Sequence, residues 1–270
     1  MNALEQTLEQ MGSVLVAFSG GVDSALVLRA ALNVSAVRVV AYTASSPSVP
    51  AEELELADQL ATAWGAEHLV VDSDELSREG YRANAGDRCF FCKSELFEIG
   101  ERLREEHGLQ WLVDGTNQDD LSDIRPGLKA AAQRNVRHPL VEAGLDKRAV
   151  RELAKKLNIP VWDKPAFACL GSRFPVGTLV DADKLRCVDM AERAVRREGF
   201  RQFRVRWHEL GDDILARIEV SPDEIERLIS PGVRQRVVVA CLHAGFRWVS
   251  VDLLGYRAPT TAPLVQRERE

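Results

Sequence analysis

Four short apolar segments alternate with helix-forming segments over the first part of the chain, and this alternation restricts the possible folds most strongly. The apolar segments have the composition of buried strands and span Ser13–Phe18, Val37–Tyr42, His68–Asp72 and Trp111–Asp114. Helical spacing of apolar residues marks Ala25–Val34, Glu52–Trp64, Lys93–His107 and Asp146–Asn158. Strands and helices in this order predict a doubly wound α/β domain, a parallel sheet with helices on both faces.

A different order of elements follows a proline-rich stretch between residues 159 and 177. Because Pro160, Pro165 and Pro175 interrupt regular structure, we expect one domain at 1–165 and a second at 176–258. The second domain is predicted to contain helices and strands in the order helix 183–198, strands 203–208 and 215–220, helices 222–229 and 233–243, and strand 248–253. This pattern indicates a smaller α+β domain, and 259–270 is expected to be a flexible tail.

Charge and hydropathy restrict the partners and the compartment. The chain has 35 Lys and Arg against 41 Asp and Glu, a net charge of −6, which argues against an extended nucleic-acid surface. Its longest wholly apolar run, Val237–Leu242, is far below the roughly 18 residues of a membrane-spanning helix. The first residues lack the basic start of a signal peptide. We therefore expect a cytoplasmic protein that binds neither membrane nor nucleic acid, with its five cysteines as thiols.

The hexapeptide SGGVDS stands between the first predicted strand and its helix. Gly20 and Gly21 permit backbone conformations in which successive amides converge on an anion, and the helix that follows adds the positive end of its dipole. Ser19 and Ser24 add hydroxyl donors. Asp23 would repel phosphates unless a divalent cation lay between them, so it predicts bound Mg²⁺. The loop lacks the Gly-Lys-Ser/Thr of a Walker A motif, and we interpret it as a nucleotide site rather than a capped turn.

This loop resembles the pyrophosphate loop of the ATP pyrophosphatases, which adenylate a substrate and release pyrophosphate. The resemblance implies a sheet of the PP-loop, or adenine nucleotide alpha hydrolase-like, type and places the adenine near AYTASSP at 41–47. A second polar segment, DGTN at 114–117, follows a strand at its carboxyl end, where ligands bind in open α/β sheets. The expected ATP-binding residues are Ser19, Gly20, Gly21, Asp23, Ser24, Tyr42, Thr43, Gly115 and Thr116.

Three further segments narrow the resemblance. RCFFCK at 88–93, DGTNQDDLSDIRPG at 114–127 and PAFACLGSRFPVGT at 165–178 together resemble the LarE family, ATP-dependent sulfur transferases that build the nickel-pincer cofactor of lactate racemase. The resemblance implies that Mg-ATP adenylates the carboxylate of a pyridinium dicarboxylate mononucleotide. It also implies a sulfur donor at Cys169, which becomes dehydroalanine. Implied partners are a carboxylase and nickel-insertion proteins, and a homo-oligomer is expected.

Chemical reasoning about the thiols leaves two alternatives. Cys169 lies in the proline-bracketed loop near Arg173, where an accessible thiol beside a cation favours thiolate. The expected catalytic residues are Cys169, Asp23 and Arg173. Adenylation makes a carboxylate attackable by such a thiolate. In the alternative, Cys89 and Cys92 join Cys169 as ligands of a 4Fe-4S iron–sulfur cluster that carries the sulfide.

Basic and acidic residues elsewhere are candidates for substrate binding. Arg204, Arg206 and His208 share one face of a predicted strand and would suit the phosphate of a mononucleotide. Asp119, Asp120 and Asp123 could help hold a metal, although the simpler interpretation of this acidic loop is that it is solvated. The expected substrate-binding residues are Arg88, Arg125, Ser172, Glu192, Arg206 and Glu224. Competing functions are an amide-forming PP-loop synthetase, a tRNA thiolase and a non-catalytic ATP-binding sensor.

Overall fold

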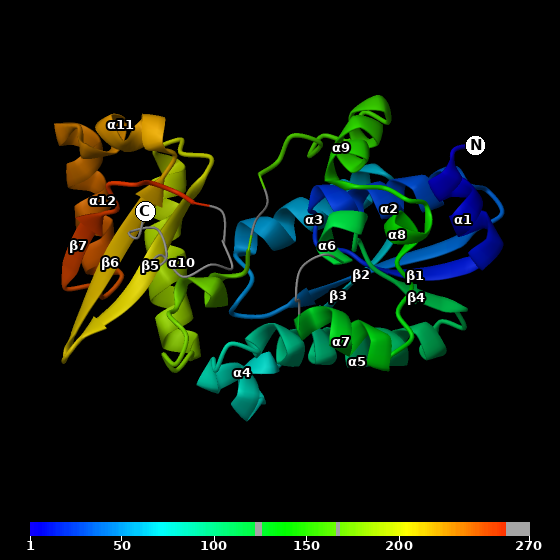
Figure 1. Cartoon of the computed structure of the whole chain (residues 1–270), viewed down its shortest axis with the longest axis horizontal. Coiled ribbons are helices and arrows are strands. Elements are labelled where there is room, and N and C mark those ends of the chain that lie inside the picture. Colours follow the sequence, from blue (N-terminus) through cyan, green and yellow to red (C-terminus); the bar gives the residue numbers. More distant parts are fainter. Residues whose placement is uncertain (122–125, 166–167, 258–270) are drawn as a thin grey trace, which may run out of the picture. The chain divides into compact units, whose positions relative to one another are not determined.

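The computed structural model describes residues 1–121, 126–165 and 168–257 of the chain. The fold divides into two compact units (Figure 1). The first contains Met1–Cys169 and Val176–Ala182, and the second contains Leu170–Pro175 and the chain from Asp183 onward. The chain therefore leaves the first unit directly after Cys169 and returns to it for seven residues before the second unit continues.

A four-stranded parallel sheet forms the centre of the first unit, as the alternation predicts. Its strands lie in the order β3-β2-β1-β4. They span β1 (Ser13–Ala17), β2 (Arg38–Ser45), β3 (Glu67–Asp72) and β4 (Trp111–Val113). The chain runs outward from β1 through β2 to β3 and then crosses to the other side of β1 to form β4, so the order reverses beside β1. Ligands of open α/β sheets bind at this reversal, beyond the carboxyl ends of the strands.

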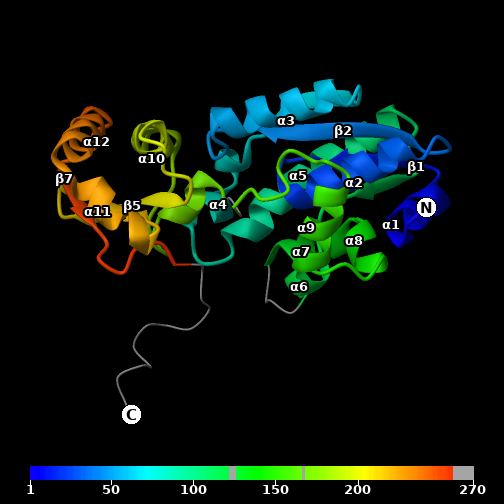
Figure 2. The same ribbon diagram turned by 90° about the horizontal axis from the view of Figure 1, so that it is seen from above.

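Helices cover both faces of this sheet, and alternate residues of β1 show the division. Val14 and Val16 pack into one apolar cluster with helices α1 (Ala3–Met11), α2 (Val22–Asn33), α3 (Ala51–Ala63), α8 (Pro139–Glu142) and α9 (Lys147–Lys156). Leu15 and Ala17 pack into a second cluster with α5 (Arg88–Glu106) and α7 (Pro126–Gln133). Figures 1 and 2 show α5 and α2 on opposite faces, with α1, α8 and α9 beside α2. The doubly wound α/β prediction is confirmed.

Two helices differ from the sequence-based expectation. Helix α1 is absent from the predicted elements, although Asn2 and Glu5 form a reciprocal capping box at its start. Helix α5 begins at Arg88 rather than at the predicted Lys93, so the C-x-x-C pair lies in its first turns. The short elements of this unit are a 3₁₀ turn (Glu75–Ser77), α4 (Glu79–Ala83) and α6 (Gln118–Leu121).

The second unit is the smaller α+β structure that the sequence predicts. Strands β5 (Phe203–Leu210) and β6 (Asp213–Val220) form an antiparallel hairpin, and β7 (Trp248–Val251) pairs in parallel with β6. Its helices are α10 (Ala182–Arg197), α11 (Ile225–Ile229) and α12 (Pro231–His243), with 3₁₀ turns at Leu170–Arg173 and Pro222–Glu224. The predicted helix 222–229 is thus a 3₁₀ turn followed by the short α11.

Aromatic side chains form the core of the second unit. The ring of Trp207 lies between those of Phe174 and Phe246, with centroids 5.6 and 5.4 Å away. Phe174 belongs to the segment 170–175 that the second unit draws from the proline-rich stretch. None of the helices in the described part of the chain is long and apolar enough to cross a membrane.

Candidate functional site

The glycine loop between β1 and α2 is closed by its own serines. Ser24 Oγ accepts a hydrogen bond from the Ser19 amide at 3.2 Å, donates one to the Gly21 carbonyl at 3.2 Å and lies 3.1 Å from Ser19 Oγ. Of the two glycines, Gly20 uses the left-handed conformation, with φ +68°, whereas Gly21 is extended, with φ −78°. Gly21 is the N-cap of α2 and has no side chain to cap it. The first amides of α2 are therefore left for an anion.

Strand β2 supports this loop from one side. Thr43 Oγ1 donates to the carbonyl of Phe18, the residue before the loop, at 2.6 Å. His68 Nε2 lies 2.8 Å from the same hydroxyl, and since the Thr43 hydrogen goes to Phe18, the imidazole is the donor. Burial lowers the pKa of His68, and nearby Asp58 partly offsets the shift. Thr43 thus lies at the loop, where its predicted part in ATP binding stays a prediction.

Tyr42 lies on the opposite face of the sheet. Its ring is fully buried in the second apolar cluster beside Phe97, and its hydroxyl donates to the Leu96 carbonyl at 3.1 Å. The structure therefore gives Tyr42 a packing role against α5. Its predicted contact with ATP is not tested.

Asn117 links two carboxylates at the start of α2, the half-buried Asp23 and the buried Asp120. Asn117 donates through Nδ2 to Asp23 Oδ1 at 2.9 Å, and Asp120 accepts from the Asn117 amide at 3.2 Å. Burial raises the pKa of Asp23, Asn117 opposes this, and the charge of Asp120 raises it again. Lys147 Nζ is 3.4 Å from Asp120. Asp120 is 9% exposed, so the solvated interpretation of this residue is wrong. Asp119 is exposed, and the metal-site candidate Asp123 lies outside the described residues.

The carboxylates of Asp23 and Asp120 fit Mg²⁺. Burial is the main cause of the raised pKa of Asp23, and a divalent cation between the two carboxylates would relieve the repulsion that Asp120 adds to it. Within the described ranges no three His, Cys, Asp or Glu side chains converge on one point that could hold a metal. Mg²⁺ commonly uses one or two carboxylates and completes its shell with substrate phosphates and water. The pair therefore suits a cation that arrives with a nucleotide.

The loop after β4 rests directly on the glycine loop. Asp114 accepts from the amide and the hydroxyl of Thr116 at 3.0 and 2.9 Å, and its Oδ1 lies 2.7 Å from His138 Nδ1. Burial would raise the pKa of Asp114, but His138 and other donors lower it overall. A Cβ at Gly115 would lie 2.7 Å from the Ser24 nitrogen. The contact between the two loops therefore requires a glycine at position 115. The sequence had suggested a different reason for this glycine, the close approach of a phosphate or ribose.

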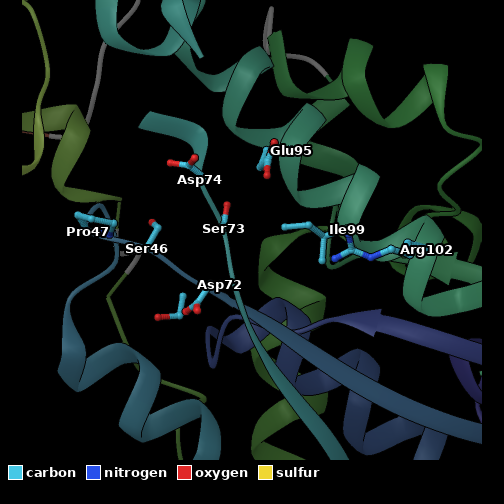
Figure 3. Close-up of a pocket in the computed structure, with 9 residues that line it drawn as sticks. Ser46, Pro47, Asp72, Ser73, Asp74, Glu95, Ile99 and Arg102 are labelled. Atoms are coloured by element: carbon cyan, nitrogen blue, oxygen red, sulfur yellow. The ribbon is translucent and has the colours of Figure 1, made fainter. Parts of the chain in front are cut away.

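A polar pocket of about 580 Å³ opens at the ends of β2 and β3. Figure 3 shows residues of the two strand ends on one side and residues of α5 on the other. Its lining consists of Ser45, Ser46, Pro47, Asp72, Ser73, Asp74, Glu95, Ile99 and Arg102. Residues 45–47 belong to the segment expected near the adenine. The volume falls within the roughly 300–1,000 Å³ typical of small-molecule sites.

The three cysteines of the two alternatives all belong to the first unit. Burial raises the pKa of Cys92 to about 12, and the charges of Cys169, Glu75 and Cys89 contribute to this shift. Cys169 is half-buried and Cys89 is exposed. All three cysteines are reduced. Within the described residues they do not form a cluster of side chains that could hold a metal ion.

Arg88 supports the chain that follows the Cys169 loop. Its guanidinium donates to Asn84 Oδ1 and lies 6.0 Å from the centre of the Tyr81 ring. Asn84 in turn accepts from the Gly177 amide at 2.9 Å and donates to the Thr178 carbonyl at 3.3 Å. Arg88 therefore has a structural part here, and its predicted contact with substrate stays a prediction.

Four predicted residues of the second unit form one network. Arg173 makes a two-pronged ion pair with Glu192, with N···O distances of 2.7 and 3.0 Å, and also donates to Ser172 Oγ at 2.9 Å. Arg206 donates to the Ser172 carbonyl at 2.9 Å and to Glu219 at 3.0 Å. Arg173 and Glu192 are almost completely buried, which makes them a brace between the 3₁₀ turn and α10. Their expected catalytic and substrate-binding roles are not tested.

Two predicted substrate residues stand apart from this network. Glu224 pairs with Arg227 at 2.6 Å on α11. Arg125 lies outside the described residues. The structure also reveals residues that sequence reasoning missed, above all His138 and Glu75. Asp114 lies 24 residues from His138, and Ser46 and Ser48 lie 29 and 27 residues from Glu75, so no local pattern marked these contacts.

Comparisons with known proteins agree with this geometry. The family model described as Thiamine biosynthesis protein (ThiI) matches residues 9–160. An uncharacterized protein of Synechocystis sp. is 41% identical over 255 residues, which cover 94% of this chain and 94% of that protein. The pyridinium-3,5-bisthiocarboxylic acid mononucleotide synthase of Lactiplantibacillus plantarum is 36% identical over 256 residues, 94% of this chain and 91% of the synthase. A glutamine-hydrolyzing GMP synthase of Aeropyrum pernix is 28% identical over 72% of this chain and 42% of its own length.

Proposed function

The chain belongs to the LarE family of PP-loop ATP pyrophosphatases, and from this membership we propose that it is an ATP-dependent sulfur transferase of nickel-pincer cofactor synthesis. The observation that carries the proposal is the pairing of the uncapped start of α2 with the half-buried carboxylate of Asp23 and the buried carboxylate of Asp120. This arrangement suits the pyrophosphate of Mg-ATP. The proposed substrate is the pyridinium dicarboxylate mononucleotide, whose thiolated product would serve lactate racemase.

In the proposed first step, a substrate carboxylate oxygen attacks the α-phosphorus of ATP and pyrophosphate leaves. Ser19, Gly20, Gly21 and Ser24 hold the leaving pyrophosphate through hydroxyls and the amides of α2. Asp23 and Asp120 would hold Mg²⁺, which would neutralise the charge of the phosphates when bound. The pocket at residues 45–47 receives the adenosine.

In the proposed second step, the Cys169 sulfur attacks the acyl carbon, the new S–C bond forms, and AMP leaves with the electrons of the C–O bond. Loss of the Cα proton and cleavage of the Cβ–S bond then release the thiocarboxylate and leave dehydroalanine at position 169. The half-buried position of Cys169, in the same unit as the nucleotide loop, supports this role. Such a protein would be consumed by one turnover.

The variant Cys169→Ala tests this assignment. It should still form the acyl adenylate and release pyrophosphate, because the nucleotide loop is unaltered, and it should form no thiocarboxylate. The measurement is nucleotide chromatography alongside mass spectrometry of the small-molecule product. Sulfur transfer by this variant would contradict the donor assignment.

A second candidate mechanism is favoured by one observation, the effect of both Cys89 and Cys169 on the pKa of Cys92. Three thiols are a suitable donor set for a 4Fe-4S cluster with one open iron. In that case Cys92→Ala would abolish thiolation, and anaerobically purified protein would absorb near about 400 nm. If Cys169 acts alone as the donor, Cys92→Ala transfers sulfur at the wild-type rate.

The remaining proposals concern binding and partners. Arg206, with Arg204 beside it on β5, is proposed to meet the substrate phosphate, as are Arg88, Arg125, Ser172, Glu192 and Glu224 around the substrate. The proposed partners are a carboxylase that supplies the substrate and a nickel-insertion protein that receives the product. We also propose a cytoplasmic homo-oligomer.

A further inference from the structure

Glu75, at the start of the 3₁₀ turn after β3, carries a carboxylate that is buried beside the polar pocket of the first unit. The residue is 2% exposed. Three hydroxyl groups donate to it, those of Ser46 and Ser48 to Oε1 at 2.6 and 2.5 Å and that of Ser73 to Oε2 at 2.8 Å. An ionised carboxylate accepts hydrogen bonds and donates none. Glu75 therefore fixes the direction of the hydroxyl hydrogens that reach it.

Two of these three serines line the pocket. Ser46 and Ser73 belong to its lining just beyond the ends of β2 and β3 (Figure 3), whereas Ser48 is 2% exposed and lies outside the lining. The hydroxyl oxygens of Ser46 and Ser48 are also 2.9 Å apart, so Ser48 is a second acceptor for the Ser46 hydrogen. In either arrangement the hydrogens of both lining hydroxyls are used within the cluster. Toward the pocket these hydroxyls offer their oxygen lone pairs.

Other side chains at the strand ends have the same polarity. Asp72 and Asp74 line the pocket there and add carboxylate oxygens, which accept hydrogen bonds. The lining also contains Arg102 of α5, and Figure 3 shows Ile99 between Arg102 and the strand ends. The Arg102 side chain is 66% exposed and lies 3.9 Å from Glu106. The strand ends thus favour a ligand group that donates hydrogen bonds, and Ile99 offers apolar surface to a ring.

The distance from the nucleotide loop selects the part of ATP that extends to these serines. The loop follows β1, and β3 is the second strand away in the order β3-β2-β1-β4. Neighbouring strands lie about 4.8 Å apart, so β3 is roughly 10 Å from the strand that carries the loop. The base is the part of ATP farthest from its phosphates. With pyrophosphate at the loop, the base therefore extends to Ser46 and Ser73.

We propose that Glu75 is a specificity-determining residue, which makes the pocket select adenine over 6-oxopurines by holding the Ser46 and Ser73 hydrogens away from the base. This inference rests on the proposed function. Adenine has an amino group at position 6, which donates, whereas hypoxanthine and guanine have a carbonyl oxygen there, which accepts. A serine oxygen whose hydrogen is held by Glu75 pairs with the amino group and leaves the carbonyl without a donor. Glu75 acts on the base through the two serines and is a positioning residue.

The test compares the affinities of wild type and Glu75→Gln for Mg-ATP and Mg-ITP by calorimetric titration. ITP has a carbonyl oxygen in place of the 6-amino group. Wild type should bind ATP at least about tenfold more tightly than ITP, because a buried carbonyl without a donor costs free energy. In Glu75→Gln an amide nitrogen donates where the carboxylate accepted, so a serine is free to turn its hydrogen toward the pocket. The ratio of the two affinities should then fall at least about fivefold.

Two matched serine variants separate the pocket from the cluster behind it. Ser48→Ala and Ser73→Ala each remove one donor to Glu75, and of these two serines Ser73 alone lines the pocket. Ser73→Ala should weaken ATP binding and leave ITP binding nearly unchanged, so the ratio falls. Ser48→Ala should retain the wild-type ratio. A general loss of stability would lower both affinities together, so the ratio reports the pocket itself.

The results that would overturn the inference differ from those that would overturn the proposed function. A wild-type ratio near one, or equal ratios in wild type, Glu75→Gln and Ser73→Ala, would overturn the role of Glu75 while ATP use stands. Titration with 2′-deoxy-ATP identifies the group at the serines. If Ser73→Ala changed the preference for ATP over 2′-deoxy-ATP and not that over ITP, the serines would face the ribose and the inference would be wrong. Failure of wild type to bind Mg-ATP would overturn both.

Discussion

At the scale of single residues, the site depends on buried charges whose partners come from distant parts of the chain. Asp114 and His138 are 24 residues apart in sequence, and their side chains lie 2.7 Å from each other below the nucleotide loop. The pKa of His138 is raised by Asp114 in spite of burial, and the pKa of Asp114 is lowered by His138 in spite of burial. The pair therefore links the stability of this loop to pH.

The direction of that pH dependence follows from both shifts. Asp114 contributes to the unfolding free energy above its unfolded pKa of about 3.9. His138 makes its full contribution to the unfolding free energy below its unfolded pKa of about 6.5. As pH rises beyond that value, His138 loses its proton and its contribution declines. Relative to His138→Gln, which keeps a donor but does not titrate, the unfolding free energy of wild type should thus fall as pH rises above about 6.5 and through the raised pKa of His138. Urea denaturation across this range measures the difference, and parallel pH profiles for the two proteins would contradict it.

Residues of the nucleotide loop were predictable because their chemistry is local. SGGVDS carries its glycines, serines and carboxylate in one hexapeptide, and the structure closes that hexapeptide with its own hydrogen bonds. The burial of Asp120 was not predictable. Its burial depends on the backbone amide of Asn117 and on Lys147 at the start of α9. In the sequence alone, a run of acidic residues in a loop indicates a solvated surface.

At the scale of secondary structure, the strands were predictable and the polar ends of elements were less so. The apolar run predicts β2 only as far as Tyr42, whereas the strand continues to Ser45. Thr43 and Ser45 are polar because they end the strand at the nucleotide edge, so hydropathy alone marks them as loop. Helix α5 likewise extends back to Arg88, where its first turns pack against Gly80 of α4, a contact that no periodicity reveals.

The contact between the β4 loop and the glycine loop supplies a test at this scale. Gly115→Ala places a Cβ 2.7 Å from the Ser24 nitrogen, and a backbone atom cannot move aside as a flexible side chain can. The variant should lose roughly 1–3 kcal/mol of unfolding free energy and bind ATP more weakly, because the start of α2 is displaced. Denaturation and ATP titration measure both effects.

Gly232→Ala is the matched control for that variant. Its Cβ would meet only the end of the flexible Arg236 side chain, at 3.4 Å, so stability and ATP binding should be retained. If Gly115→Ala were as stable as wild type and bound ATP equally well, the close seating of the two loops would be wrong.

At the scale of the whole molecule, the two units contain different parts of the proposed machinery. The first holds the nucleotide loop, the carboxylates of Asp23 and Asp120, and Cys169, and the second holds the hydrogen-bonded network of Arg173, Glu192 and Arg206. The sequence predicts both fold classes correctly, because strand and helix order is a property of long segments. It did not reveal that the chain returns to the first unit at Val176–Ala182, since that return is fixed by backbone contacts to Arg82 and Asn84.

The mass of the wild-type protein after one turnover tests the central claim most directly. After incubation with Mg-ATP and the pyridinium dicarboxylate mononucleotide, the protein should be lighter by about 34 Da, the mass of one sulfur and two hydrogens. Fragmentation should place the change at Cys169. An unchanged protein mass together with thiolated product would contradict the account, because the sulfur would then have come from elsewhere.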